Sequence, residues 1–428
     1  MRRLGVTLGP WRRKASEAEA IDFLLLQGWR PAVVTERRAE VEPEARAVLE
    51  RFVTLGLGFE RTSGGARLFD PSELANFMQW SHTELGDPFW GEQNLPLARS
   101  VFWLEHGLEP RADVRPPPPS KLPPRRFRVS LRRRFDLSDR EAGSSVRLRL
   151  PLPIEDAALS GLELAIDPAP GAEINIAPAR LDVRVAVPAD GAVELGYVAS
   201  FVARPTWRDA AAPALGPADA ALFTRPNEGL VKVTAETRAL VRELAGGAHD
   251  PWTRVERFWR FVMERLRFGV INYEELDAAR PLAWALDNGW CDCQLGSAVL
   301  TTLCRADGIP ARMLSGYALD EDTPYFHYWA EAWIDSRGWV PLDTVSWSLS
   351  RGGRDPLWAD YLFGEVNYRM TTERLPRLFN GPGAVRFPAA VMRLGRIRDG
   401  GLEQGYYDAD TRALLFADHV AVLESHPL

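Results

Sequence analysis

Three residues in the second half of the chain are of the types that carry out nucleophilic acyl chemistry. They are, in chain order, a cysteine, a histidine and an aspartate: Cys293, His327 and Asp343. A thiolate attacks acyl carbons, an imidazole exchanges the protons that the attack requires, and a carboxylate orients the imidazole. The three residues therefore predict an enzyme with a Cys-His-Asp catalytic triad, if the fold brings them together.

The residues that follow Cys293 predict a helix that carries the thiol at its start. Its apolar-face positions recur at helical spacing: Leu295, Ala298, Val299, Thr302, Leu303 and Ala306. Gly308 and Pro310 then end the helix. In or just before the first turn, unpaired backbone N–H groups and the positive end of the helix dipole favour the thiolate over the thiol. We therefore expect an activated nucleophile at Cys293.

Short strands are predicted to position the other two residues. Residues 313–317 and 327–334 read as strands, and the second places His327, Trp329, Glu331 and Trp333 on one face. A turn at Arg337-Gly338 leads into a further strand over residues 339–343. A hairpin of this length brings Asp343 beside His327, which is the geometry that a base and its orienting carboxylate require.

These ordered blocks resemble the transglutaminase-like superfamily, whose members are relatives of the papain-like thiol proteases. The matching blocks are Cys293 with residues 305–312, then residues 315–317, 327–331 and 338–343. The resemblance implies an α+β catalytic domain in which a helix-borne cysteine packs on an antiparallel sheet. It also implies that no metal or organic cofactor is required, because calcium dependence belongs to only part of the family and no acidic loop here demands it.

Two cysteines compete for the role of nucleophile. The family motif has a glycine two residues before its cysteine, and Gly289 therefore points to Cys291. The motif also fixes the length of helix between its cysteine and the position of Arg305, and this spacing points to Cys293. A helix is rigid, whereas a preceding loop absorbs a shift, so we assign Cys293 and keep Cys291 as the alternative. Cys304, near the end of the helix, reads as a buried small apolar residue.

The resemblance implies acyl transfer or hydrolysis at an amide or thioester through a thioacyl-enzyme intermediate. The expected partners are an acyl donor (a peptide, a protein or a carrier-protein thioester) and an amine or water as acceptor. Four alternatives remain: an amide-bond-forming enzyme that acts on carrier-protein thioesters in natural-product assembly, a cysteine peptidase, a non-catalytic binding or scaffold protein, and a redox or metal-binding protein that uses Cys291 and Cys293. The last is weak, because the Cys-x-Cys pair lacks a second pair of ligands.

Composition sets wider limits. A net charge of −6 gives no reason to expect nucleic acid or a membrane as partner. The three cysteines lie close together rather than spread as a disulfide framework, and no signal peptide or spanning segment is evident, so we predict a cytoplasmic protein. Nearly all basic residues are arginine, which indicates a bacterial genome; lysine occurs only as Lys14, Lys121 and Lys232.

The remaining sequence predicts five parts. They are a helical N-terminal region (1–112), a proline-rich linker (113–125), a β-sandwich (126–205), the catalytic domain (206–350) and a partly β extension of that domain (351–428). Within them we expect a helix that begins at Pro43, a hairpin turn at Asp190-Gly191, and a helix with Asp250 as its N-cap and Pro251 in its first position.

Overall fold

The computed structural model describes most of the chain. The described residues are 15–28, 31–55, 59–69, 74, 77, 121–156, 158–207, 214–269, 271, 276–319, 324–335, 337–345, 361–374, 391–398, 401–408 and 414–428. Within them, no helix has both the length and the apolar character needed to cross a bilayer. The predicted linker over 113–125 lies mostly outside the described residues, and the predicted domain boundaries and cytoplasmic location remain predictions.

The N-terminal region has a small apolar core of its own. Its elements are β1 (Ala15–Ser16), α1 (Glu17–Gly28), α2 (Pro31–Thr54), β2 (Phe59–Arg61) and β3 (Arg67–Phe69). The expectation that a helix begins at Pro43 is wrong, since α2 begins at Pro31 and carries Pro43 inside it, with non-helical dihedrals at Arg37. Val34 and Val41 are buried in the same cluster as Phe52, so packing extends the helix past the proline.

Seven strands follow, and the first six belong to two antiparallel sheets that share one core. They are β4 (Arg125–Asp136), β5 (Ser145–Pro151), β6 (Leu159–Asp167), β7 (Glu173–Ala177), β8 (Arg180–Ala186), β9 (Ala192–Ala203) and the short β10 (Thr206–Trp207), which pairs elsewhere. The order β4-β9-β6 forms part of one sheet, and β5-β8-β7 forms the other. Alternate residues of β4 and β5 are buried in the same apolar cluster, which explains the period of two in the sequence.

The turn at Asp190-Gly191 is not a hairpin. A hydrogen bond from the Gly191 N–H to the Pro188 carbonyl closes a turn there, but β8 and β9 belong to different sheets. A side chain at Gly191 would contact the Ser138 backbone at 2.9 Å, and its φ of +67° is in the left-handed region. Gly191 therefore allows a tight turn that carries the chain from one sheet to the other. The sequence signal for such a turn is the same as for a hairpin.

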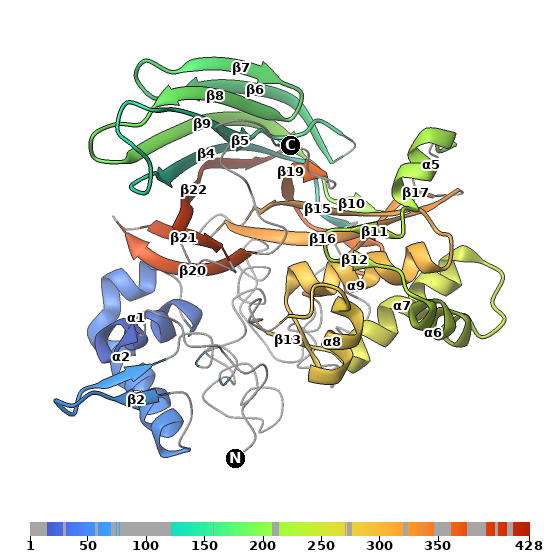
Figure 1. The fold of residues 1–428 in the computed structure, drawn as a ribbon, viewed down its shortest axis with the longest axis horizontal. Helices are drawn as coiled ribbons and strands as arrows, with labels where there is room; N and C mark the ends of the chain where they lie inside the picture. Colours follow the sequence, from blue (N-terminus) through green and yellow to red (C-terminus); the bar gives the residue numbers. More distant parts are fainter. Residues whose placement is uncertain are drawn as a thin grey trace.

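The end of the chain corrects a second expectation. The strands β20 (Val391–Arg398), β21 (Gly401–Asp408) and β22 (Leu414–Pro427) do not extend the sheet that carries His327, which is called the catalytic sheet below. They continue the sheet of β4, in the order β20-β21-β22-β4-β9-β6, and β22 pairs with β4 from Phe416↔Phe135 to Pro427↔Arg125 (Figure 1). Of the described strands in this part of the chain, β18 (Glu365–Val366) and β19 (Arg369–Arg374) lie near the catalytic sheet, and β19 forms its edge.

The catalytic part is a helical layer against a four-stranded antiparallel sheet. The helices are α5 (Pro217–Phe223), α6 (Ala235–Ala245), α7 (Pro251–Arg265), α8 (Pro281–Asn288) and α9 (Cys293–Ala306). The sheet order is β17-β16-β15-β19, from β17 (Gly338–Leu342), β16 (Tyr325–Ile334), β15 (Ala311–Ala318) and β19. Short pairs also form between β11 (Asn227–Glu228) and β12 (Val231–Lys232), and between β13 (Arg267–Phe268) and β14 (Trp290–Cys291).

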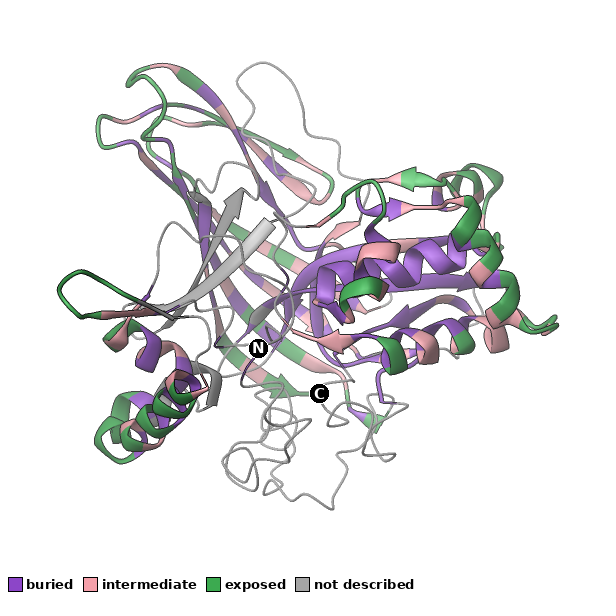
Figure 2. Cartoon of the chain, turned by 60° about the horizontal axis from the view of Figure 1, so that its bottom comes forward, coloured by how far each residue is buried: buried purple, intermediate pink, exposed green. Residues whose placement is uncertain are grey.

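Helix α9 is the centre of this layer. Every residue from Cys293 to Arg305 is buried, whereas α7 buries one face, and Asp250 and Pro251 begin α7 as predicted. Figure 2 shows the enclosed strands and helix in purple, with exposed green faces on the surrounding helices. The predicted α+β arrangement, in which a helix-borne cysteine packs on an antiparallel sheet, is confirmed.

Candidate active site

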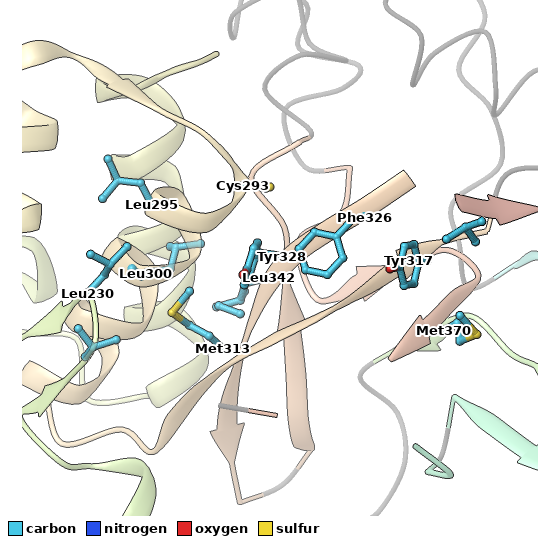
Figure 3. Packing of buried hydrophobic residues seen from close by; sticks show 14 of the residues in the cluster. Leu230, Cys293, Leu295, Leu300, Met313, Tyr317, Phe326, Tyr328, Leu342 and Met370 are labelled. Carbon is cyan, nitrogen blue, oxygen red and sulfur yellow. The ribbon is translucent and has the colours of Figure 1, made fainter. Parts of the chain in front are cut away.

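The local sequence places Cys293 at the first position of α9. Asp292 is the N-cap, with its side chain accepting a hydrogen bond of 2.8 Å from the Leu295 N–H. The far end of the helix is anchored to the sheet, because Arg305 donates to the Ala311 carbonyl at 2.8 Å and pairs with Glu228 at 3.0 Å. The length of the helix between Cys293 and Arg305 fixes where the sulfur lies. Figure 3 shows Cys293 at the start of the helix, with Leu295 and Leu300 further along it.

Cys291 lies in a different environment. It belongs to the short strand β14, and its sulfur packs against the first turn of α9, 3.2 Å from where a side chain at Gly296 would begin. Burial, followed by the negative charges of Asp292 and Cys293, raises the pKa of Cys291 well above its usual value. Burial likewise raises the pKa of Cys304 to about 12. Burial thus disfavours the thiolate at both of these cysteines.

His327 and Asp343 meet as the hairpin predicts. Asp343 is the first residue after β17, which pairs with β16 through Ala330↔Leu342. The His327 Nε2 is 2.9 Å from both carboxylate oxygens of Asp343. Because Nε2 faces the carboxylate, the imidazole presents its other nitrogen to a second partner, and that partner is the side chain of Cys293. The fold thus brings all three predicted residues together.

The three residues are almost fully shielded from solvent. Cys293, His327 and Asp343 expose 1%, 2% and 0% of their surfaces. Burial acts to lower the pKa of His327, but the carboxylate of Asp343 and the sulfur of Cys293 outweigh it, so the pKa of His327 is raised. The imidazolium form is therefore favoured in the folded site, and a neighbouring imidazolium stabilises a thiolate.

Asp343 has a further partner that the sequence did not reveal. Burial acts to raise its pKa, but Arg369, His327 and the Val345 N–H outweigh that effect and hold the pKa well below its usual value. The Arg369 guanidinium lies 2.5 Å from Asp343 Oδ2, and the Val345 N–H donates to Oδ1 at 2.9 Å. Asp343 is therefore a carboxylate that stays ionised while completely buried.

Two glycines allow the elements to approach closely enough to form this site. A side chain at Gly296 would lie 2.9 Å from Thr344, next to Asp343, so α9 and the end of β17 could not approach as they do. A side chain at Gly316 would lie 2.1 Å from the Met370 carbonyl of β19. A glycine inside a helix or a central strand is a visible sequence signal of such contact. Arg369 gives no comparable signal, because its partner is set by strand order.

A cavity of about 460 Å³ lies beside the site, on the part of the sheet that carries Trp329 and Arg369. Its lining also includes Glu331, which pairs with Arg312 at 2.7 Å, and Trp339, over which the Arg312 guanidinium stacks at 3.9 Å. The predicted shared face of β16 thus forms one wall of this cavity. Among the described residues, no group of three or more His, Cys, Asp or Glu residues is arranged to hold a metal ion.

Comparisons with known proteins agree with this geometry. Residues 238–344, a quarter of the 428-residue chain, match the model of the Transglutaminase-like superfamily. The matched segment contains Cys293, His327 and Asp343, and it ends before Arg369. No curated protein matches the chain.

Three solved structures are similar at low sequence identity. A candidate cysteine protease from Cytophaga hutchinsonii is 13% identical, with 70% of this chain and 98% of that chain covered and a TM-score of 0.41. The periplasmic domain of TgpA from Pseudomonas aeruginosa is 17% identical, with 57% and 93% covered and a TM-score of 0.30. A red sea bream transglutaminase is 11% identical, with 67% and 57% covered and a TM-score of 0.26.

Since all three TM-scores are below 0.5, these likenesses assign neither reaction nor substrate. The family match confirms the resemblance seen in the sequence. Residues 238–344 of this chain form a domain of the Transglutaminase-like superfamily.

Proposed function

We propose that this protein is an acyl-transferring or acyl-hydrolysing enzyme in which Cys293 is the nucleophile, His327 the general acid and base, and Asp343 the residue that orients His327. One observation carries the proposal: the buried His327 imidazole lies 2.9 Å from Asp343 through Nε2 and has the side chain of Cys293 as a second hydrogen-bonding partner. A structural histidine requires partners, but not a thiol at a helix start and an ionised carboxylate together.

The electrostatics of the site support an activated thiol. The positive end of the α9 dipole lies at Cys293, its first residue, and the raised pKa of His327 favours the imidazolium beside it. Both effects stabilise the Cys293 thiolate relative to the thiol. The same end of the helix favours the negative charge that develops on an attacked carbonyl oxygen, and we propose that backbone N–H groups there, including that of Cys293, donate to it.

The reaction would proceed in two steps, the acylation of Cys293 and the release of the acyl group. The Cys293 thiolate attacks the carbonyl carbon of an amide or thioester, and a C–S bond forms as the carbonyl becomes a tetrahedral oxyanion. The His327 imidazolium gives its proton to the leaving amine or thiol as the bond to that group breaks, which leaves a thioacyl-enzyme and a neutral imidazole. An amine or water then attacks the thioacyl carbon while His327 takes its proton, and the released thiolate completes the cycle.

A small activated ester tests this proposal without knowledge of the natural donor. The protein is mixed with p-nitrophenyl acetate, quenched in acid, and analysed by peptide mass spectrometry. We expect one acetyl group on Cys293, absent from the Cys293→Ser variant and retained in the Cys291→Ala variant. Acetylation of Cys291 instead, or labelling of Cys293 that is unchanged in His327→Gln, would contradict the assignment.

The acceptor that takes the acyl group from the enzyme distinguishes acyl transfer from hydrolysis. Adding glycinamide to the acetylated enzyme measures how the acyl group is divided between amine and water. A dominant amide product supports acyl transfer, including transfer from carrier-protein thioesters, whereas a dominant acid supports hydrolysis and a peptidase. If no acyl-enzyme forms above the level of Cys293→Ser, the non-catalytic binding or scaffold function replaces the proposal.

A further inference from the structure

Arg369 enters the site from outside the segment that matches the family. It is the first residue of β19, which pairs with β15 through Ala318↔Arg369. The register of this pair shifts between Ser315 and Gly316, and Gly316 faces His327 across the other edge of β15. The absence of a side chain at Gly316 lets the β19 backbone lie against it. This irregular edge places Arg369 next to the carboxylate of Asp343.

The contacts of Arg369 tie it to the site. The side chain is 3% exposed, and its one ion pair among the described residues is the 2.5 Å contact with Asp343 Oδ2. The same nitrogen donates to the Asn367 side chain at 3.3 Å, and the guanidinium lies 4.9 Å from the centre of the Trp329 ring. Its Nε and Nη1 have no hydrogen-bond partner among the described residues. A buried guanidinium is costly, so Asp343 is the group that compensates it.

The charges along the site alternate. The charged groups that act on Asp343 are Arg369 from β19 and His327 from β16, and Cys293 from α9 acts on His327 in turn. In the activated state the groups are, in spatial order, a thiolate, an imidazolium, a carboxylate and a guanidinium, so that negative and positive charges alternate. Without the guanidinium, the other three would carry a net negative charge in a buried site, and one carboxylate oxygen would lose its charged partner.

We propose that Arg369 is a positioning residue that holds the Asp343 carboxylate in the orientation in which it receives the His327 N–H. This inference rests on the proposed function, because it assigns a role within that triad. Arg369 acts through Asp343, and its described polar and ring contacts are with Asp343, Asn367 and Trp329. The site is therefore a four-residue arrangement whose last member comes from the segment after the family domain.

The test compares two buried arginines that each pair with a buried aspartate. Arg369→Met is expected to lower kcat/KM for p-nitrophenyl acetate by about 10–100-fold, the usual effect of losing an outer partner of an active-site group. Arg133→Met is the matched control, measured per folded molecule, since Arg133 pairs with Asp418 at 2.7 Å and does not line the cavity beside the site. We expect the control to keep the wild-type rate within about twofold. Arg369→Lys should recover part of the rate, since it keeps the charge but not the planar geometry.

The pH profile distinguishes positioning from a structural role. Burial raises the pKa of Asp343 and Arg369 opposes it, so in Arg369→Met the carboxylate should become protonated at higher pH. The acid limb of kcat/KM should therefore move to higher pH in this variant and stay in place in Arg133→Met. A folded Arg369→Met enzyme with the wild-type rate and acid limb would overturn the inference.

A double variant decides the matter if Arg369→Met does not fold. Asp343→Asn and Asp343→Asn/Arg369→Met should have equal rates, because a residue that acts only through Asp343 has nothing left to act on. A further loss of rate in the double variant would overturn the inference. If the wild-type enzyme itself does not exceed Cys293→Ser, the proposed function has failed, and that result is distinct from a failure of the role of Arg369.

Discussion

Two buried aspartates in this protein pair with buried arginines, yet their surroundings differ. Asp418 of β22 accepts two hydrogen bonds from Arg133 of β4, at 2.7 and 2.8 Å, and a third of 2.7 Å from the Tyr317 hydroxyl of β15. It thereby links the large sheet to the catalytic sheet. Asp343 faces an arginine on one side and His327 on the other.

The difference lies in the chemistry of the partners. Arginine and tyrosine do not exchange protons at neutral pH, so these partners of Asp418 serve as a fixed joint between the two sheets. An imidazole does change its charge near neutral pH, and His327 also contacts a thiol. Burial and an ion pair alone therefore do not mark a catalytic carboxylate, whereas a titrating neighbour in contact with a nucleophile does.

The sharpest way to test this comparison is to make the same substitution at both aspartates. Asp343→Asn should lower the rate of Cys293 acylation by about 10²–10⁴-fold, because an amide neither fixes the imidazole tautomer nor stabilises the imidazolium. Burst amplitude and rate with p-nitrophenyl acetate, corrected for the folded fraction, provide the measurement. A folded variant that acylates at the wild-type rate would show that Asp343 is structural.

Asp418→Asn should act on stability instead. It leaves Arg133 buried without a carboxylate, which typically costs about 3–5 kcal/mol of unfolding free energy. Urea unfolding measures this loss, and the acylation rate per folded molecule should stay within about twofold of wild type. If the rate fell while the unfolding free energy held, the Asp418 cluster would belong to the active site and the comparison would fail.

Tyr317→Phe should have a smaller effect of the same kind. It removes the third hydrogen bond to Asp418 but keeps the ring in its apolar contacts with Phe326, so we expect a loss of about 1–3 kcal/mol. The same urea experiment measures it. In an Asp418→Asn background the further loss should shrink, and full additivity would mean that the two groups are not coupled.

The smallest expected effect is the pH dependence that His327 gives to stability. Because its pKa is raised in the folded protein, its protonation stabilises the fold fully below about pH 6.5, its usual pKa, and this contribution is lost as the pH rises through the folded pKa. The difference in unfolding free energy between wild type and His327→Gln should therefore be more favourable to wild type at pH 5.5 than at pH 8.5. A difference that is constant with pH would contradict the raised pKa.

The parts of the site that follow one another in the chain were predictable from sequence. The start of α9, the two strands around Arg337-Gly338 and the meeting of His327 with Asp343 depend on local signals such as turn residues, periodicity and a short hairpin. Helix length also favoured Cys293 over Cys291, and the structure places Cys293 against His327. Signals within short segments of the sequence therefore predicted most of the geometry of the site.

Pairings between distant segments were not predictable in this way. Arg369 reaches Asp343 because β19 joins the edge of β15, and β22 joins β4 although paired residues such as Phe416 and Phe135 are 281 positions apart in the chain. The sequence of residues 351–428 predicted only a partly β segment, and periodicity within a strand does not show which strand it will pair with. The prediction of a hairpin at Gly191 was wrong for a related reason: a tight turn does not specify whether the next strand stays in the same sheet.

The central claim is that the buried Cys293 thiol is activated by His327, and site-resolved alkylation tests it directly. Folded protein is treated with iodoacetamide between pH 5 and 8, and each cysteine peptide is quantified in wild type and in His327→Gln, which keeps a side chain in place of the imidazole. We expect Cys293 to be labelled at pH 6 in wild type and far more slowly in His327→Gln, while Cys291 and Cys304 stay unlabelled. Equal labelling of Cys293 in both proteins, or preferential labelling of Cys291, would contradict the account.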